Sequence, residues 1–169
     1  MPRGRGTRPT SDRVREGLFS TLESTFGTLA DLRFVDAYAG SGAVGLEALS
    51  RGAAYVLFIE SAGPALQALR RNIDNLALSD TVVAARAVRT VLGERPDVPY
   101  DVFFADPPYA IDPAELADVL DLAARWLAPD GVLVVERASR DGEPPWPPTV
   151  SDVRSRTYGD TTLWYGRRS

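Results

Sequence analysis

Four consecutive residues, Asp106-Pro107-Pro108-Tyr109, combine a carboxylate, two rigid prolines and an aromatic ring. They follow the apolar run 100–105, which predicts a buried strand that delivers these groups to one point. A carboxylate and a proline carbonyl can accept hydrogen bonds from an exocyclic amine, and an exposed ring can stack on a base. This Asp-Pro-Pro-Tyr tetrapeptide therefore predicts a clamp for the edge of a nucleobase. Taken alone, it is more typical of a rigid turn after a strand.

A glycine-rich turn follows an earlier apolar run. Residues 33–38 predict a strand, and Gly40, Gly42 and Gly45 then give the spacing G-x-G-x-x-G before a predicted helix over 44–51. Glycine lets the backbone turn tightly and approach a ligand, and a helix N-terminus favours polar or anionic groups. Such turns also occur for packing alone, so the glycine turn (residues 39–42) is weak evidence of a ligand by itself.

Two acidic residues refine the interpretation of this turn. Glu60 ends a predicted strand over 55–59, about 20 residues after the glycines, where dinucleotide-binding folds hold ribose hydroxyls. Asp36 lies where a pyrophosphate would otherwise sit, and a carboxylate there repels phosphate but attracts an ammonium group. The pattern favours a cofactor with an amine and an adenosine, such as S-adenosylmethionine, over NAD. The alternative is that both acids only cap neighbouring helices.

The scaffold that must position these residues is predicted from hydrophobic periodicity. Strand and helix patterns alternate five times, which is typical of an α/β fold whose mostly parallel sheet has helices on both faces. Ligands bind outside the carboxyl ends of such strands, so Asp36, Glu60 and Asp106 are expected to converge on one crevice. The other expected elements are a helix from Ser11, a helix from about Ala62, strands over 81–86, 101–105 and 132–136, a helix that begins at an Asp112–Glu115 capping box, a turn at 129–131, and a C-terminal antiparallel hairpin over 150–157 and 161–165.

Composition limits the chemistry. The chain has 169 residues, which predicts one domain over 1–169. It contains no cysteine and no histidine, which excludes disulfides, zinc-thiolate sites, imidazole ligands and histidine catalysis, and no metal is expected. No apolar run reaches about 18 residues and the N-terminus has no apolar segment, so neither a membrane span nor a secretory signal is expected. We expect a cytoplasmic monomer.

Charge is distributed unevenly along the chain. The net charge of −4 at first argues against a nucleic-acid partner. All 19 basic residues, however, are arginine, and five of them crowd the first sixteen positions. The arginine guanidinium binds phosphate through paired hydrogen bonds and stacks on bases. An extended basic segment over 1–10 could therefore belong to a local surface that binds nucleic acid. The alternative is a solvated tail in a protein from a GC-rich genome.

Together these residues resemble the class I S-adenosylmethionine-dependent methyltransferases, and within them the amino-methylating group with a D/N-P-P-Y/F/W motif. The match to the RsmD family is closer. That family methylates N2 of one guanine in small-subunit (16S) ribosomal RNA. Its motifs are matched in order, over nearly the whole chain, by residues 8–16, 36–52, 106–109 and 158–161. The resemblance implies a Rossmann-like methyltransferase fold.

The resemblance also implies the positions that bind S-adenosylmethionine. Asp36 and the glycine turn would hold the methionine end, and Glu60 would bind the ribose hydroxyls. Family members often have an acidic residue near the adenine, whereas this chain has Ala87-Val88, so the adenine would be held by backbone groups and apolar contact. The implied cofactor positions are Asp36, Ala39, Gly40, Ser41, Gly42, Glu60, Ser61, Ala87, Val88 and Asp106.

The implied partner is 16S ribosomal RNA or the assembled 30S subunit. Asp106 and Pro107 would hold the guanine amine, and Tyr109 would stack on the base. Family members begin with a short β-hairpin, whereas only seven residues precede Arg8 here, so the hairpin is expected to be missing. RNA affinity would then be lower, with cofactor binding intact. The positions implied to contact RNA or to order the cofactor pocket are Arg8, Thr10, Arg13 and Arg15.

Two other functions are left open by the sequence. An adenine-N6 DNA methyltransferase uses the same kind of tetrapeptide to hold the amine of its target base. Such enzymes usually carry a separate target-recognition region, and 169 residues leave little space for one. A non-catalytic RNA-binding or ribosome-assembly module could keep a vestigial cofactor fold, but the intact Asp36, Glu60 and Asp106 argue against it.

Overall fold

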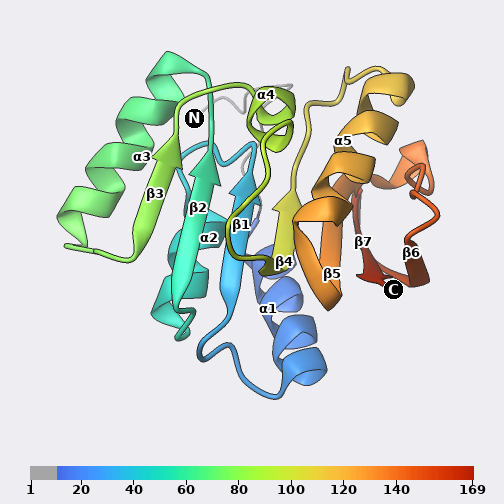
Figure 1. The fold of residues 1–169 in the computed structure, drawn as a ribbon, viewed down its shortest axis with the longest axis horizontal. Helices are drawn as coiled ribbons and strands as arrows, with labels where there is room; N and C mark the ends of the chain where they lie inside the picture. Colours follow the sequence, from blue (N-terminus) through green and yellow to red (C-terminus); the bar gives the residue numbers. More distant parts are fainter. Residues whose placement is uncertain (1–10) are drawn as a thin grey trace.

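A seven-stranded sheet runs through the computed structural model, which describes residues 11–169 (Figure 1). The predicted extended segment 1–10, with Arg8 and Thr10, lies outside the described residues. The strands are β1 (Arg33–Ala37), β2 (Tyr55–Ile59), β3 (Thr81–Ala84), β4 (Tyr100–Ala105), β5 (Leu127–Ala138), β6 (Val150–Tyr158) and β7 (Thr161–Arg168). Their order is β3-β2-β1-β4-β5-β7-β6. The first five strands are parallel, and β6 and β7 form the predicted antiparallel hairpin.

Helices cover both faces of the sheet, as predicted (Figure 1). They are α1 (Asp12–Phe26), α2 (Ala43–Ser50), α3 (Gly63–Asn75), α4 (Val88–Leu92) and α5 (Pro113–Trp126), with a short 3-10 turn, η1 (Ser139–Asp141). Buried side chains of α1, α2 and α3 pack on one face, and those of α4 and α5 pack on the other. None of the helices in the described part is long and apolar enough to cross a membrane.

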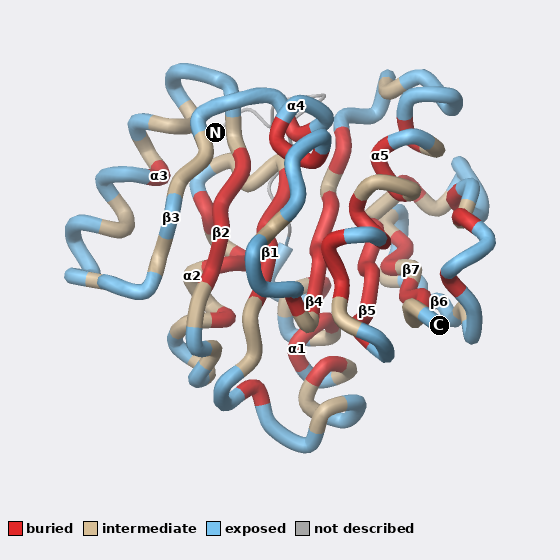
Figure 2. Tube along the Cα trace, viewed as in Figure 1, coloured by how far each residue is buried: buried red, intermediate tan, exposed pale blue. Residues whose placement is uncertain are grey.

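The central strands are buried on both sides (Figure 2). Successive residues of β1 show this, because Phe34 packs in the layer with α1 and Val35 packs in the layer with α5. In β4, Val102 and Phe103 divide between the two layers in the same way. This double burial explains why the strands are continuous apolar runs rather than alternating ones.

Helix α1 follows its sequence pattern closely. The Ser11 side chain caps it by accepting a hydrogen bond from the Val14 N–H at 3.2 Å. Val14, Leu18 and Leu22 form the predicted buried stripe. Gly27, with φ of 84°, ends the helix.

The segment after β3 differs from the prediction. The strand ends at Ala84 rather than at residue 86, and the chain then forms α4, which was not predicted. Five residues are too few to show helical periodicity, so no pattern indicates this helix. Tertiary contacts stabilise its end instead, since the Trp126 indole N–H donates to the Leu92 and Glu94 carbonyls at 3.2 and 3.0 Å.

The predicted capping box of α5 is wrong. Asp112 precedes the helix, but its side chain accepts no hydrogen bond from the first turn. The first helical residue is Pro113, and Asp112 is exposed. The helix begins instead through its backbone, with the Leu116 N–H donating to the Asp112 carbonyl at 2.9 Å.

Strand β5 begins earlier than predicted. Leu127 already pairs with Tyr100, and the register then shifts so that Val132 pairs with Val102. The predicted turn at 129–131 is the irregularity between these pairs, where Asp130 adopts a φ of 67°. From Val132 onward the strand runs regularly to the edge where β1 and β4 also end.

The strand order reverses between β1 and β4. The chain moves outward from β1 to β2 and β3, then returns to place β4 on the other side of β1. Such a switch point leaves a crevice at the carboxyl ends of the two central strands, where open α/β sheets bind ligands.

Candidate functional site

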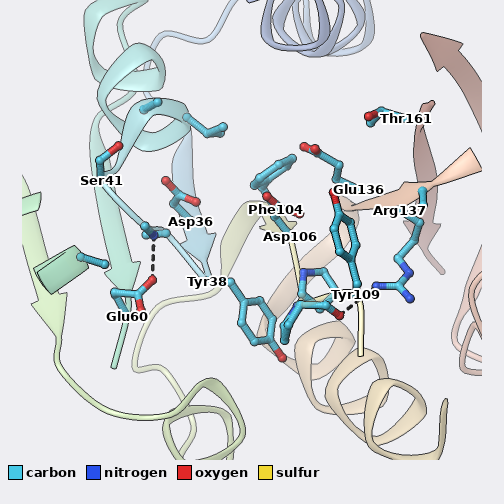
Figure 3. A pocket seen from close by; sticks show the side chains of 18 of the residues that line it. Asp36, Tyr38, Ser41, Glu60, Phe104, Asp106, Tyr109, Glu136, Arg137 and Thr161 are labelled. Carbon is cyan, nitrogen blue, oxygen red and sulfur yellow. Dashed lines mark hydrogen bonds between the residues drawn. The ribbon is translucent and has the colours of Figure 1, made fainter. Parts of the chain in front are cut away.

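A pocket of about 660 Å³ lies at the switch point, over the carboxyl ends of β1, β2, β4 and β5 (Figure 3). Five acidic residues line it, Asp36, Glu60, Asp106, Glu136 and Asp160. The convergence of the first three is as predicted, and it joins the glycine turn to the tetrapeptide in one site. The predicted site residues that line the pocket are Asp36, Ala39, Gly40, Ser41, Glu60, Asp106, Pro107 and Tyr109.

The glycine turn has the left-handed backbone that its glycines predict. Gly42 has a φ of 89°, and a side chain at this position would collide with Leu69 of α3. The turn begins at Tyr38, which adopts a φ of 58° although it is not glycine. Its Ala39 N–H donates to the Ile59 carbonyl at 3.0 Å, which joins the turn to the end of β2.

Asp36 is almost fully buried, with 2% of its surface exposed. Its carboxylate accepts a hydrogen bond from the Gly45 N–H of α2 at 2.9 Å. Burial raises the pKa of Asp36 to about 8; the Gly45 hydrogen bond opposes the rise, and the charges of Glu60 and Glu136 add to it. The group is therefore largely protonated at neutral pH in the pocket by itself, and a cation beside it would favour the ionised form.

Glu60 holds three backbone N–H groups. One oxygen accepts from Gly40 at 2.7 Å (Figure 3), and the other accepts from Ser61 at 3.0 Å and Ala62 at 2.9 Å. Asp36 and Glu60 therefore do accept hydrogen bonds from backbone N–H groups, as the alternative interpretation predicts. This does not exclude a ligand, because both side chains also line the pocket and a carboxylate can accept about four hydrogen bonds.

Asp106 lies directly after β4. Its N–H is 3.4 Å from the Ala37 carbonyl, which holds it against the end of β1. Burial raises its pKa well above the usual value, the charges of Glu136 and Asp36 raise it further, and Arg137 lowers it. The acidic groups of the pocket therefore repel one another, and a ligand with positive charge would relieve this repulsion.

The rest of the tetrapeptide is held rigidly while its ring faces solvent. Pro107 is buried and lines the pocket. The Pro108 carbonyl accepts hydrogen bonds from the Ile111 N–H at 3.1 Å and from the Arg137 guanidinium at 3.4 Å. Tyr109 is 46% exposed at the pocket (Figure 3), so its ring is available to a planar partner. The tetrapeptide is a rigid turn and a candidate clamp at the same time.

Several pocket residues were missed from the sequence. Glu136 and Arg137 come from the end of β5, and the strand-end rule that located Asp106 would also have located them. The tip of the β6–β7 hairpin adds Asp160 and Thr161, which the antiparallel pairing of β7 with β5 brings to the site. No local pattern identifies that long-range contact.

Four predicted cofactor positions do not line the pocket: Gly42, Ser61, Ala87 and Val88. Gly42 shapes the turn, and Ser61 contributes its N–H to Glu60. Ala87 precedes α4, and Val88 is buried in that helix rather than standing at a strand end. Their cofactor roles stay predictions.

The two arginines within the described residues that were predicted to contact RNA or order the cofactor pocket, Arg13 and Arg15, lie on α1, away from the pocket lining. Arg15 forms ion pairs with Asp12 at 2.7 Å and with Glu47 of α2 at 2.8 Å. It thereby links α1 to the helix that follows the glycine turn. The Arg13 guanidinium lies 5.7 Å from the centre of the Tyr158 ring. Contact of either residue with RNA stays a prediction.

The pocket suits a cationic ligand that also carries hydrogen-bonding groups. Acidic residues outnumber the two arginines of its lining, Arg137 and Arg140, which disfavours phosphates, and its backbone turns and carboxylates can hold ammonium and hydroxyl groups. Within residues 11–169, no group of three or more potential ligands is arranged to hold a metal ion.

Comparisons with known proteins identify relatives of this chain. The family model described as "Conserved hypothetical protein 95" matches residues 1–167. "Ribosomal RNA small subunit methyltransferase D" of Escherichia coli (strain K12) is 35% identical over 159 residues, covering 94% of this chain and 78% of the relative. The protein of the same name from Haemophilus influenzae is 36% identical over 134 residues, covering 78% and 68%. The solved structure of "Putative methyltransferase yhhF" from Escherichia coli has a TM-score of 0.84 and 30% identity, covering 99% of this chain and 91% of that one.

Proposed function

The chain belongs to the RsmD family, whose model is described as Conserved hypothetical protein 95, and on that premise we propose that it methylates the exocyclic N2 of a guanine in 16S ribosomal RNA with S-adenosylmethionine as donor. The observation that carries the proposal is the shared pocket. The tetrapeptide, a clamp for an amino base, opens into the same space as the acidic groups and the glycine turn, which suit the donor. The names of the relatives support ribosomal RNA as the acceptor.

The pocket residues fit S-adenosylmethionine by their chemistry. Asp36 would face the cofactor's ammonium group, which favours its ionised form despite the raised pKa. Glu60 would accept hydrogen bonds from the ribose hydroxyls while it holds the Gly40 N–H. When bound, the cofactor supplies a methyl group on a sulfonium centre, which is a strong electrophile. No covalent enzyme intermediate is required.

The tetrapeptide would act by positioning the base. The N2 lone pair of guanine is delocalised into the ring, so the amine is a poor nucleophile. Hydrogen bonds from N2–H to Asp106 and to the Pro107 carbonyl would favour a more tetrahedral nitrogen and aim its lone pair at the methyl group. Tyr109 would stack on the base. These are effects of orientation and electrostatics.

The choice of acceptor is tested by comparing unmodified 30S subunits, naked 16S RNA and duplex DNA with labelled S-adenosylmethionine. We expect transfer to the ribosomal substrates and none to DNA. Transfer to DNA alone would support an adenine-N6 DNA methyltransferase. Absence of transfer together with absence of cofactor binding in calorimetry would support a non-catalytic module. The proposal also includes a cytoplasmic location and a monomeric state. Sedimentation of the purified protein tests the monomeric state.

A further inference from the structure

Asp106 directly follows β4, and Glu136 lies near the end of the neighbouring strand β5, at the same edge of the sheet. β4 and β5 are parallel, and their last paired residues are Ala105 and Val135. The next residue on each strand is therefore a carboxylate, and parallel neighbours are about 4.8 Å apart. Both side chains line the same pocket (Figure 3). Because they occupy matching positions in the register, they lie on the same face of the sheet.

The end of β5 is tied to the tetrapeptide. The Arg137 guanidinium donates to the Pro108 carbonyl at 3.4 Å and pairs with Asp141 at 3.5 Å. These contacts limit movement of Glu136 relative to Asp106. The charge of Glu136 is also the largest neighbouring-charge contribution to the raised pKa of Asp106, which indicates close approach of the two carboxylates.

Two adjacent acceptors match one nucleobase edge. Guanine presents two neighbouring donors, N1–H and the N2 amine, whereas adenine presents a donor beside the N1 lone pair. A carboxylate placed opposite N1 would accept a hydrogen bond from guanine and would repel adenine. A site that is built to hydrogen-bond a polar group rejects analogues that lack it, because its own polar groups are then left unpaired.

We propose that Glu136 is a specificity-determining residue, which accepts a hydrogen bond from N1–H of the target guanine while Asp106 accepts one from N2–H. The pair then reads the Watson–Crick edge and selects guanine over bases that have a lone pair at N1. This inference rests on the proposed function, since it requires a guanine in the pocket.

The test uses an acceptor that differs from guanine at N1. 2-Aminopurine keeps the amine at C2 but has a lone pair at N1. The substrates would be 30S subunits reconstituted with 16S RNA that carries either guanine or 2-aminopurine at the methylated position. Initial rates of methyl transfer would be compared for the wild type, Glu136→Ala and Glu136→Gln. Glutamine is informative because its amide can donate to the 2-aminopurine N1.

We expect the wild type to prefer guanine over 2-aminopurine, and both variants to lower this preference by at least about tenfold. Glu136→Gln should also transfer to 2-aminopurine faster than the wild type does. 2-Aminopurine also lacks the O6 of guanine, but this difference affects the wild type and both variants alike. It therefore cancels when the guanine-to-2-aminopurine rate ratio of each variant is compared with that of the wild type. Glu143→Gln is the matched control, because Glu143 is exposed and does not line the pocket.

The outcomes separate this inference from the proposed function. Wild-type transfer to guanine subunits with the same base preference in all variants would overturn the role of Glu136 alone. The same holds if the variants lose cofactor affinity in calorimetry with the preference unchanged, because Glu136 would then belong to the cofactor site. Absence of wild-type transfer to guanine would overturn the proposed function and this inference with it.

Discussion

The Glu60 carboxylate accepts a hydrogen bond from the Gly40 N–H at 2.7 Å, so the residue directly after β2 holds the glycine turn that follows β1. Asp36 does the same for the helix beyond that turn, through its hydrogen bond with the Gly45 N–H. Both acids thus shape the backbone of the pocket and also face its interior. Substitutions at either position are therefore expected to affect ligand binding and folding together.

Replacing Glu60 by alanine removes the acceptor of three backbone N–H groups and the proposed ribose ligand. We expect S-adenosylmethionine to bind at least tenfold more weakly. We also expect the free energy of unfolding to fall by about 1–3 kcal/mol. Glu60→Gln keeps one carbonyl oxygen, so its cofactor affinity and its stability should both be intermediate between those of Glu60→Ala and the wild type. Calorimetry and denaturant titration measure the two quantities. Wild-type cofactor affinity in Glu60→Ala would contradict the assignment.

The raised pKa of Asp36 predicts that cofactor binding depends on pH. An ammonium group prefers the ionised carboxylate, so S-adenosylmethionine should bind more tightly as pH rises from 6 towards 8, the pKa of the group. Binding at pH 7 should also release protons, which calorimetry in buffers of different ionisation enthalpy detects. Asp36→Asn should bind more weakly and lose the part of the pH dependence that Asp36 contributes. A pH dependence unchanged in this variant would contradict the role given to Asp36.

The same pKa predicts the effect of pH on stability. Folding raises the Asp36 pKa from 3.8 to about 8, so the folded state binds more protons than the unfolded state within this range. Its contribution to stability is complete below pH 3.8 and is lost as pH rises towards 8. Asp36→Asn can still accept from Gly45 and has no charge to bury. Its stability relative to the wild type should therefore rise between pH 5 and 8 in denaturant titrations, and a constant difference would contradict this explanation.

Gly45 lies where α2 touches β2. A side chain added there would collide with the Phe58 ring and with Val56. Gly45→Ala should therefore lower stability by about 1–3 kcal/mol through overpacking. Gly63→Ala is the matched control, because nothing lies within 4 Å of a side chain added there. Thermal unfolding of the two variants tests the difference, and equal midpoints would show that α2 can move away from β2.

Tyr109 is exposed, so its substitution separates base stacking from folding. Stacking of a base on an aromatic ring contributes about 1–3 kcal/mol. Tyr109→Ala should lower kcat/KM for the RNA acceptor by about 10- to 100-fold, with cofactor affinity and stability unchanged. Tyr109→Phe keeps the ring and should remain close to the wild type. Equal losses in both variants would indicate a role for the hydroxyl instead.

The sequence was most informative where one local pattern decides the structure. The apolar runs of the strands, the stripe of α1 and the glycine spacing each record burial or backbone geometry within a few residues. The rule that ligands bind at strand ends then placed Asp36, Glu60 and Asp106 together before their contacts were known. Family resemblance supplied the guanine and the ribosomal RNA, which no pattern of residues indicates.

The features that were not predicted depend on tertiary contacts. Helix α4 is short and is held by Trp126 from α5. The predicted Asp112 cap is absent, and α5 begins instead with a backbone hydrogen bond from Leu116 to Asp112. Thr161 reaches the pocket only through the pairing of β7 with β5. Arg15 is predicted to contact RNA or to order the cofactor pocket, and no local pattern indicates its ion pair with Glu47 of α2.

The central claim is that Asp106 holds a guanine amine of 16S RNA beside the methyl donor. Its most direct test is mass-spectrometric mapping of 16S RNA after incubation of unmodified 30S subunits with S-adenosylmethionine and either the wild type or Asp106→Ala. We predict N2-methylguanosine at one position with the wild type and none with the variant, whose cofactor affinity stays within a few-fold of the wild type in calorimetry. Methylation of another base, or N2-methylguanosine formed at a near-normal rate by Asp106→Ala, would contradict the account.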